Sequence, residues 1–600
     1  MAALFTTPKR NDKTSGAHFV EPDVRRRTLL AHGSWRRVTR RIVVGAVCAL
    51  TVSSLLMPSV SLAAEWVDVG GVRHEAAAGP TGDAAGTWSW DGADDMRLNA
   101  YDGGAILAAG KLNIAYEGKN TVKTEPDYTG AAIKAQDGTN QKAELNITSS
   151  KSSDELNVTA EADAIKSTGD LSISGPGTVN TTSTSSDGIE AKGDLSITGS
   201  GTVNATGGTE GIQSKGETTI DSSGTVIAKG GEGYGIAAGS GLIIKGGGKV
   251  EASSIEEAAI WADGGINISG GSQVKANSEG DLAVDTEGSL AVTNASLDAS
   301  GVEYGVHAFG GVTFDHATVT VRTSAGGGQA IALITDGDDI VIKNGSTVDA
   351  FAEGEVSAAF STRNDRPNEK GGHIYISDSV VKAIARYVEN GDGPIPYSEN
   401  QDGETRREPQ GENIGIIAQT SEGVTPAVIS IIRSKVTAEG DTAAIFARAM
   451  SADGKTIGTI KIENAAIQTP EGGKVIDYRK LRDGIYEAGQ AIGTGDATVD
   501  SLYIKAVAKS TTIAPPEVAK PEDPKPDETK PAESKPAESK QNPKPEGSKP
   551  TKAVAASTTK AKTTGKLAAT GDASSAAIVA AALAGTAAIA AGAVVSRKRS

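Results

Sequence analysis

The sequence predicts an all-β fold, a parallel β-helix solenoid with coils of 22–25 residues. Three observations predict it. An apolar residue is followed six and eight positions later by two more, and this pattern recurs. Apolar and polar residues alternate within each short segment, as they do in β-strands. Glycines stand between the segments, where a sharp corner needs a backbone conformation that glycine adopts readily. We expect the coil to be right-handed.

The leading apolar residues of successive units recur at the interval that solenoids show. They are Ile165, Ile189, Ile212, Ile236, Ile260, Leu282, Val306 and Ile331. Leu171 and Ile173 follow Ile165, and Thr178-Val179 starts a third short strand. Because three short strands cannot enclose a core alone, each coil must stack on the next. The alternative, an array of β-sandwich domains, would need longer strands and regular linkers, which the sequence lacks before Ala514.

The solenoid is expected to span residues 96–513, with less regular strands beyond residue 350. A polar stretch with prolines, residues 390–413, predicts a loop insertion from one corner. The ends of a solenoid must be covered to stay soluble. We expect an N-terminal cap segment over residues 64–95, and a short helix over Lys480–Ala488 at the other end.

Residues 1–63 are predicted to be a secretory signal peptide. A basic region that includes Arg36 and Arg37 precedes an apolar run from Ile42 to about Leu55. Ser61-Leu62-Ala63 then supplies the small residues that a signal peptidase needs. The alternative is an uncleaved membrane anchor, which the short run and Met57-Pro58 disfavour.

The C-terminal region has a second ordered pattern. Residues 514–566 are rich in Pro, Lys, Glu and Ser and cannot bury a core, so we expect a disordered, wall-spanning linker. Leu567-Ala568-Ala569-Thr570-Gly571 comes next, followed by an uncharged apolar stretch over residues 573–595 and a basic tail. That stretch is long enough to cross a bilayer as a transmembrane helix, with the basic tail in the cytoplasm.

This order of motif, apolar helix and basic tail resembles the sorting signal of sortase substrates, whose usual motif is LPxTG. Here the motif is LAATG, similar to the LAxTG variant of some high-GC Gram-positive bacteria. The resemblance implies cleavage between Thr570 and Gly571 by a sortase, and a covalent bond from Thr570 to peptidoglycan. The protein would then be secreted and cell-wall-anchored, with only a transient membrane anchor. The alternative is a plain C-terminal transmembrane anchor.

Charge and cysteine content exclude several classes of site. The chain carries −16, of which the signal contributes +7, the linker +3 and the last residues +2, so residues 64–513 carry −28. Such an acidic body disfavours nucleic acid, which needs basic surface for its phosphates. The one cysteine, Cys48, lies in the predicted signal, so the mature chain has no disulfide and no cysteine metal site. Neutral glycans, basic partners and calcium remain compatible.

Stacking places equivalent positions about 4.8 Å apart, which predicts two acidic ladders. The first comprises Asp163, Asp187 and Glu210, and the second Asp170, Asp194 and Glu217. Like charges at that distance repel unless they are solvated, matched or metal-bound. Calcium prefers oxygen ligands, so these six residues are candidate calcium ligands. The alternative is a solvated corner.

Few aromatic residues occur in the coils, and three of them are candidates for carbohydrate binding: Trp261, Tyr234 and Tyr304. Tyr234 and Tyr304 share one register, three coils apart. An aromatic ring can stack on the apolar face of a sugar, whereas Trp88 and Trp90 are expected to shield the capped end of the core. Clustered carboxylates with a basic partner, which lyases and glycoside hydrolases need, are not evident. We therefore expect no enzyme activity.

The repeat units, of which DGIEAKGDLSITGSGTVNATG is one example, resemble carbohydrate-binding parallel β-helix domains of bacterial surface proteins. The resemblance covers residues 85–350 best and implies a polysaccharide ligand, with calcium as a candidate cofactor. A wall-anchored, adhesin-like glycan-binding protein is therefore the first hypothesis. A structural surface spacer without a small ligand is the second, and a polysaccharide lyase or hydrolase is the third.

Overall fold

A computed structural model describes residues 63–139, 142–325, 328–364, 372–388, 398–399, 405–406, 412–421, 424–452, 454–482, 485–495 and 506–516. The chain divides into two units, residues 1–518 and 519–600, and all described residues belong to the first. The predicted signal up to residue 62, most of the predicted loop insertion and linker, and the sorting motif lie outside the described residues. No helix in the described part is long and apolar enough to cross a membrane, and the predicted helix at 573–595 is not within it.

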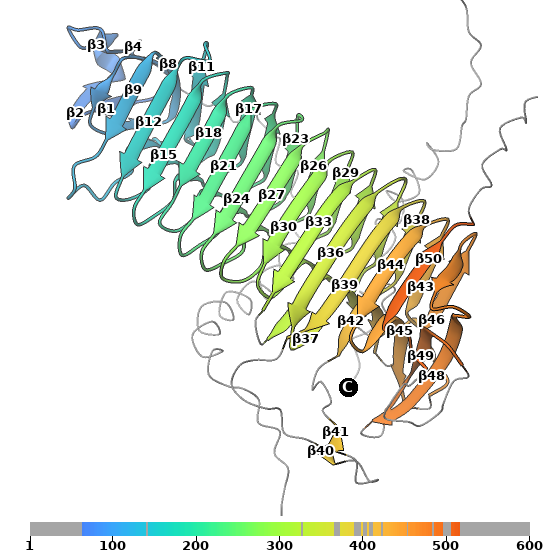
Figure 1. Ribbon diagram of the computed structural model, residues 1–600. Helices are drawn as coiled ribbons and strands as arrows, with labels where there is room; N and C mark the ends of the chain where they lie inside the picture. Colours follow the sequence, from blue (N-terminus) through green and yellow to red (C-terminus); the bar gives the residue numbers. More distant parts are fainter. Residues whose placement is uncertain are drawn as a thin grey trace, which may run out of the picture. The chain divides into compact units, whose positions relative to one another are not determined.

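The described chain is almost entirely β-structure, arranged in three long parallel sheets (Figure 1). Each coil contributes one strand to each sheet in turn. In one regular coil these are β13 (Ile165–Ser167) in sheet 1, β14 (Asp170–Ser174) in sheet 2 and β15 (Thr178–Ser183) in sheet 3. This arrangement is the one expected of a β-helix solenoid. The handedness of the coil stays a prediction.

The other parallel strands of the three sheets have the following bounds. Sheet 1 contains β7 (Ile106–Ala109), β10 (Ile133–Gln136), β16 (Ile189–Ala191), β19 (Ile212–Ser214), β22 (Ile236–Ala238), β25 (Ile260–Ala262), β28 (Val284–Thr286), β31 (Tyr304–Ala308), β34 (Gln329–Asp336), β37 (Val356–Asn364), β42 (Asn413–Thr420) and β45 (Ala443–Ser451). Sheet 2 contains β5 (Asp95–Asn99), β8 (Lys111–Glu117), β11 (Glu144–Ser149), β17 (Leu195–Gly199), β20 (Thr218–Ser222), β23 (Leu242–Lys245), β26 (Ile266–Ser269), β29 (Leu290–Thr293), β32 (Val312–Asp315), β35 (Ile340–Lys343), β38 (Ile374–Ser377), β43 (Val428–Ile432) and β46 (Thr459–Glu463). Sheet 3 contains β6 (Asp102–Gly103), β9 (Lys119–Lys123), β12 (Glu155–Ala160), β18 (Thr202–Thr206), β21 (Thr225–Gly230), β24 (Lys249–Ser254), β27 (Gln273–Ser278), β30 (Ser296–Gly301), β33 (Thr318–Ser324), β36 (Thr347–Gly354), β39 (Val380–Tyr387) and β44 (Lys435–Gly440).

The core is a stack of columns, because successive coils pair in register. Ile165, Ile189 and Ile212 are register partners in sheet 1, and all three are fully buried. Two leading residues were wrongly predicted. Ile260 pairs with Val284 rather than with Leu282, and Val306 pairs with Leu333 rather than with Ile331. In both cases two apolar residues lie two positions apart, so alternation alone could not decide which one faces the core.

Both ends of the stack are covered by antiparallel strands. At the N-terminal end, β1 (Trp66–Val69) pairs with β2 (Val72–Glu75) and with β7, while β3 (Thr81–Gly82) and β4 (Trp88–Trp90) extend sheet 2. A 3-10 turn, Ala76–Ala78, connects the two pairs. Trp90 is buried and Trp88 packs against the core. These strands therefore cover the first coil.

The predicted C-terminal helix over Lys480–Ala488 is wrong. The residues instead belong to an antiparallel pair, β48 (Lys474–Arg482) and β49 (Ile485–Gly493), and β49 also pairs with β45. The pairing runs from Lys474 with Gly493 to Arg482 with Ile485. β47 (Ala466–Thr469) and β50 (Ser510–Ala514) complete this end of sheet 3. A separate pair, β40 (Ser398–Glu399) and β41 (Thr405–Arg406), falls in the predicted loop insertion.

At most corners between sheets 2 and 3 one or two residues have a positive φ, in the left-handed region of the backbone. Early coils place glycine there, as at Gly175 and Gly199, but later coils place other residues, such as His316 with φ of 51° and Arg433 with φ of 47°. Arg433 is held by two hydrogen bonds of 2.7 Å to the Asp378 carboxylate of the preceding coil. At Arg433, therefore, hydrogen bonds to the preceding coil are found together with a left-handed backbone conformation, which is unfavourable for a residue with a side chain.

We predict that His316→Val lowers the free energy of unfolding by about 1–2 kcal/mol, because a β-branched residue tolerates the left-handed conformation poorly. Urea denaturation followed by circular dichroism measures this difference. Lys275→Val is the control, since Lys275 is exposed within β27, where a β-branched residue is favoured. Equal stabilities of the two variants would contradict the assignment of strain to this corner.

Candidate functional site

The outward-facing side chains of sheet 1 form one continuous column along the stack. In a three-residue strand the first and third residues face the core, so the middle residue points outward. In-register pairing puts these middle residues side by side, in the order Glu190, Gln213, Ala237, Trp261, Asp285 and His307. We call this column with its flanking corners the sheet 1 face. It contains all three aromatic residues predicted to bind carbohydrate.

Tyr234 and Trp261 form a stacked aromatic pair on this face. Their ring centroids are 5.4 Å apart and their planes are inclined by 20°. Tyr234 lies at the corner before β22 and Trp261 lies in the next strand, β25, so cross-coil stacking brings the two rings together. Both side chains are half-buried. We call this pair the aromatic platform, and a flat, partly exposed pair of this kind suits the apolar face of a sugar ring.

Tyr304, the third predicted aromatic residue, belongs to a different cluster. It shares the corner register of Tyr234, but its ring stacks on His307 with centroids 5.5 Å apart. The Phe309 ring packs against the same imidazole, with the two ring centroids 4.7 Å apart. The three predicted residues therefore lie on one face, but only Tyr234 and Trp261 touch each other. Asp285 lies between the two aromatic groups.

His307 is held between two carboxylates of neighbouring coils. Its Nδ1 lies 2.9 Å from Asp285 Oδ1, and its Nε2 lies 3.4 Å from Asp336 Oδ2. Arg363 donates a 3.0 Å hydrogen bond to Asp336. Burial alone would lower the pKa of His307, but the contacts with Asp285 and Asp336 raise it to about 9. An imidazole that stays protonated at neutral pH cannot act as a general base there.

Sequence reasoning missed this ion-pair chain, because its members are far apart in the sequence. Asp285, His307, Asp336 and Arg363 come from β28, β31, β34 and β37. The column register places Asp285 beside His307 only when Val284, and not the predicted Leu282, is the leading residue of that coil. Asp336 is two residues beyond the register partner of His307, and only side-chain reach brings the two together.

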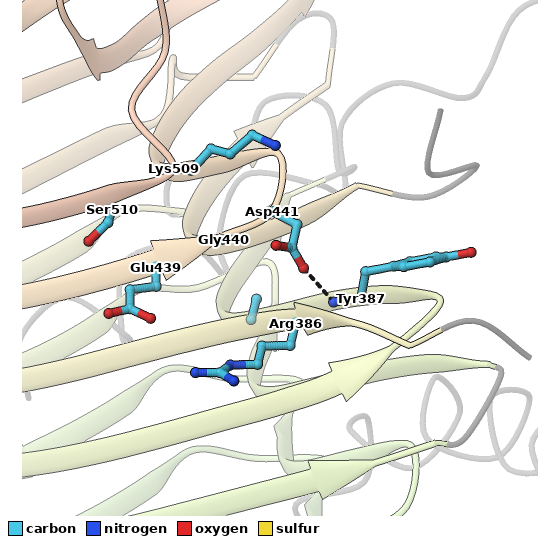
Figure 2. A pocket seen from close by; sticks show the side chains of 8 residues that line it. Arg386, Tyr387, Glu439, Gly440, Asp441, Lys509 and Ser510 are labelled. Atoms are coloured by element: carbon cyan, nitrogen blue, oxygen red, sulfur yellow. Dashed lines mark hydrogen bonds between the residues drawn. The ribbon is translucent and has the colours of Figure 1, made fainter. Parts of the chain in front are cut away.

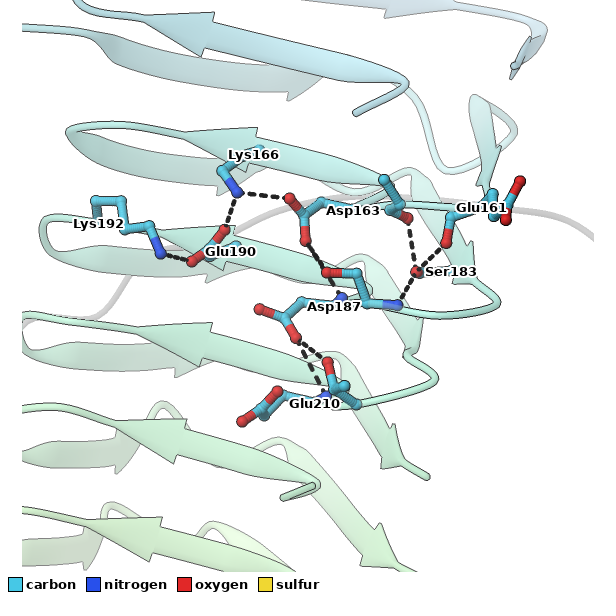
Figure 3. A network of polar contacts seen from close by, with 11 residues as sticks. Glu161, Asp163, Lys166, Ser183, Asp187, Glu190, Lys192 and Glu210 are labelled. Carbon is cyan, nitrogen blue, oxygen red and sulfur yellow. Dashed lines mark hydrogen bonds and ion pairs between the residues drawn. The ribbon is translucent and has the colours of Figure 1, made fainter. Parts of the chain in front are cut away.

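The first acidic ladder lies at the corner that precedes sheet 1 in each coil (Figure 3). Its carboxylates accept hydrogen bonds from other residues of the protein. Asp163 accepts a 2.5 Å hydrogen bond from the Ser186 hydroxyl and a 3.3 Å bond from the Asp187 backbone N–H. Asp187 likewise accepts from the Thr209 hydroxyl and from the Glu210 backbone N–H. Each carboxylate therefore accepts hydrogen bonds from the turn of the following coil.

Glu190 and Lys166, which were not predicted as site residues, complete this network. Carboxylate oxygens of Asp163, Asp187 and Glu190 all lie within 4.8 Å of one another. Lys166 Nζ contacts Asp163 at 2.6 Å and Glu190 at 2.5 Å, and Lys192 also pairs with Glu190 (Figure 3). The donor set suits a hard cation, but an ammonium group already neutralises two of its members. These three residues therefore do not fit an open calcium site.

Among the described residues no lysine or arginine forms an ion pair with Asp187 or Glu210, and Lys215 interacts electrostatically with both from a greater distance. Burial, and then the neighbouring Glu210 carboxylate, raise the pKa of Asp187 to about 8. The pair therefore holds a proton at neutral pH. A bound calcium ion would relieve the same repulsion, so calcium binding at this pair stays a prediction.

The second acidic ladder has a structural explanation. Asp170 accepts a 2.9 Å hydrogen bond from the Asp194 N–H, and Asp194 accepts an equal bond from the Glu217 N–H. A Cβ on Gly193 would lie 2.1 Å from Asp170 Oδ1, so the corner glycine leaves room for the carboxylate above it. All three acidic side chains are exposed. The ladder thus links one coil to the next through solvated carboxylates.

Two further polar features lie away from the sheet 1 face. Asp91, Asp94 and Asp95 cluster near the N-terminal end, where Asp91 accepts hydrogen bonds from the backbone of Ala93 and Asp95. A cavity of about 260 Å³ lies where β44 ends at Gly440 while β39 continues (Figure 2). Its lining residues are Ala385, Arg386, Tyr387, Glu439, Gly440, Asp441, Lys509 and Ser510. Asp441 accepts a 2.7 Å hydrogen bond from the Tyr387 N–H within it.

Comparison of the chain with protein-family models, with curated proteins and with solved structures finds no match.

We predict that the solenoid becomes less stable as the pH rises from about 4 to about 9. The pKa of Asp187 is raised to about 8 and that of Asp281 to about 7, so these groups increasingly disfavour the folded state as pH rises from their ordinary range through those values. Stabilisation by protonated His307 is complete below about pH 6.5 and is lost as the pH passes about 9. Melting temperatures measured across this pH range report the combined effect of these three groups on stability.

Asp187→Asn should raise the melting temperature at about pH 8 and make its pH dependence shallower, because the amide keeps an acceptor oxygen and removes the charge. Asp298→Asn, an exposed position of β30 on sheet 3, is the matched control. An Asp187→Asn variant that is less stable at about pH 8 than the parent would show that the charge is favourable there.

Proposed function

We propose that this chain is a secreted protein of a Gram-positive bacterium, attached to peptidoglycan by a sortase, whose solenoid binds carbohydrate through the sheet 1 face. The predicted signal peptide and the LAATG sorting signal support the surface location. The aromatic platform of Tyr234 and Trp261 is the observation that supports glycan binding, because it presents two nearly parallel rings on a regular outer face. The role is adhesin-like and non-catalytic.

Asp285 gives the platform a polar neighbour. It is the register partner of Trp261 in the next coil, so its carboxylate lies beside the indole at the spacing of adjacent strands. Carbohydrate sites commonly combine a few polar groups that fix orientation with apolar surface. One Asp285 oxygen is engaged by His307, and a carboxylate can accept further hydrogen bonds from sugar hydroxyls.

The ion-pair chain of Asp285, His307, Asp336 and Arg363 supports a positioning role rather than catalysis. His307 is protonated at neutral pH, and Arg363 is already bonded to Asp336. Hydrolases and lyases need an acid and a base whose pKa values lie near the working pH. The ion pairs of these four residues instead hold the edge of the platform in place, because they link four successive coils of sheet 1.

We predict that Trp261→Ala weakens binding of the polysaccharide that the parent chain retains on a glycan array. Loss of one stacking aromatic residue typically removes about 1–3 kcal/mol of binding free energy, which is roughly a 5- to 150-fold loss of affinity. Trp88→Ala is the control, since Trp88 is a partly exposed indole in β4 of the N-terminal cap segment, far along the stack from β25. Scoring for reducing-end or unsaturated products on the same array tests the non-catalytic role.

The other outcomes would redirect the assignment. Release of products would make the chain a polysaccharide lyase or hydrolase. Absence of retention across neutral, acidic and amino-sugar glycans, with and without calcium, would favour a structural surface spacer. Equal losses in Trp261→Ala and Trp88→Ala would place the site away from the platform.

A further inference from the structure

Carboxylates outnumber basic groups around the aromatic platform, where the nearby cations are His307, which pairs with Asp285, and Lys215, which follows β19 one coil before Tyr234. Residues 231–290 contain nine carboxylates and three lysines, Lys245, Lys249 and Lys275. Those lysines all lie on sheets 2 and 3, where Lys245 pairs with Asp221 and Lys249 with Glu251. In this segment, therefore, sheet 1 and the two corners that border it carry carboxylates and no lysine or arginine.

Carboxylates flank the platform on both sides. Asp285 lies beside Trp261 in the column. Asp263 and Glu287 stand at the corner that follows β25 and β28, and both are exposed. Glu257 and Asp281 stand at the corner that precedes those strands. Burial, and then the charges of Glu303 and Glu257, raise the pKa of Asp281 to about 7, which is the response expected of a site crowded with negative charge.

We propose that the platform selects glycans that carry protonated amino groups, such as polymers of unacetylated amino sugars. This inference rests on the proposed function and names the ligand class for the same site. An ammonium group is attracted to the faces of Trp and Tyr rings. It also donates charge-assisted hydrogen bonds to carboxylates. A glycan with free amino groups can use both interactions, and its sugar rings can still stack on Trp261.

The same field disfavours acidic glycans. Like charges brought into contact across an interface are costly and suppress the wrong partner. At physiological ionic strength the Debye length is about 8 Å, so the carboxylates next to the platform act on a ligand in contact with it, whereas distant ones are screened. Because the coils repeat along the stack, a polymeric glycan can place several of its amines next to carboxylates of successive coils. The linked contacts, each of them weak, together raise the overall affinity.

The test compares three hexasaccharides on the full-length chain at about pH 6, where sugar amines and ordinary carboxylates are both ionised. They are a glucosamine hexamer, its N-acetylated counterpart and a galacturonate hexamer. We expect the glucosamine hexamer to bind at least about tenfold more tightly than the N-acetylated hexamer, with an affinity that falls as salt is raised. We expect the galacturonate hexamer to bind most weakly.

Two variants locate the effect. Asp263→Asn/Glu287→Gln should weaken binding of the glucosamine hexamer by roughly four- to twentyfold, as the loss of two exposed charge contacts, and leave binding of the N-acetylated hexamer unchanged. Asp298→Asn, in the coil of Glu287 but on sheet 3, should change neither. Trp261→Ala should weaken both hexamers, because stacking does not depend on the amine.

The results separate failure of this inference from failure of the proposed function. Equal affinity for the glucosamine and N-acetylated hexamers would overturn the amine preference while glycan binding stands. Binding of polylysine peptides at this site without binding of the glucosamine hexamer would also overturn it. Failure of every glycan to bind would contradict the proposed function itself.

Discussion

In-register stacking of parallel coils is the constraint on which the rest of this structure depends. Each strand pairs with the equivalent strand of the next coil, so a side chain type repeated in the sequence becomes a continuous column about 4.8 Å apart. Inside, columns of Ile, Leu and Val fill the core. Outside, the same rule places Trp261, Asp285 and His307 side by side, although more than 20 residues separate each from the next.

Stacking also brings repeated acidic residues of adjacent coils close together, so their carboxylates repel one another. Three arrangements in the solenoid reduce this repulsion. Asp170 and Asp194 stay in solvent and accept backbone N–H groups of the next coil. Asp163 is neutralised by Lys166. At Asp187, for which the described residues supply no ion pair, burial and the neighbouring Glu210 raise the pKa of the carboxyl group to about 8. Around the aromatic platform the carboxylates of Asp263, Asp281, Asp285 and Glu287 lie on neighbouring coils, and the proposed preference for amino-bearing glycans rests on them.

Much of the fold could be predicted from the sequence, because a solenoid repeats its local rules. Spacing and alternation located the strands of the regular coils and the register that Tyr234 shares with Tyr304. Errors arose where two apolar residues fit the same alternation, as with Leu282 and Val284, or where the paired strands β48 and β49 were predicted as a helix. Contacts between unlike columns, such as Lys166 with Glu190 or His307 with Asp336, depend on side-chain reach and could not be found from spacing.

Photo-crosslinking tests the role of the aromatic platform most directly. The full-length chain would be irradiated with a diazirine-bearing derivative of the oligosaccharide that it retains most strongly, and the labelled peptides would be identified by mass spectrometry. The sheet 1 account predicts label within residues 231–263 and 281–309, competed by unlabelled oligosaccharide and lost in Trp261→Ala. Label concentrated at the cavity beside Tyr387 and Asp441, or on sheets 2 and 3, with residues 231–263 unmodified, would contradict it.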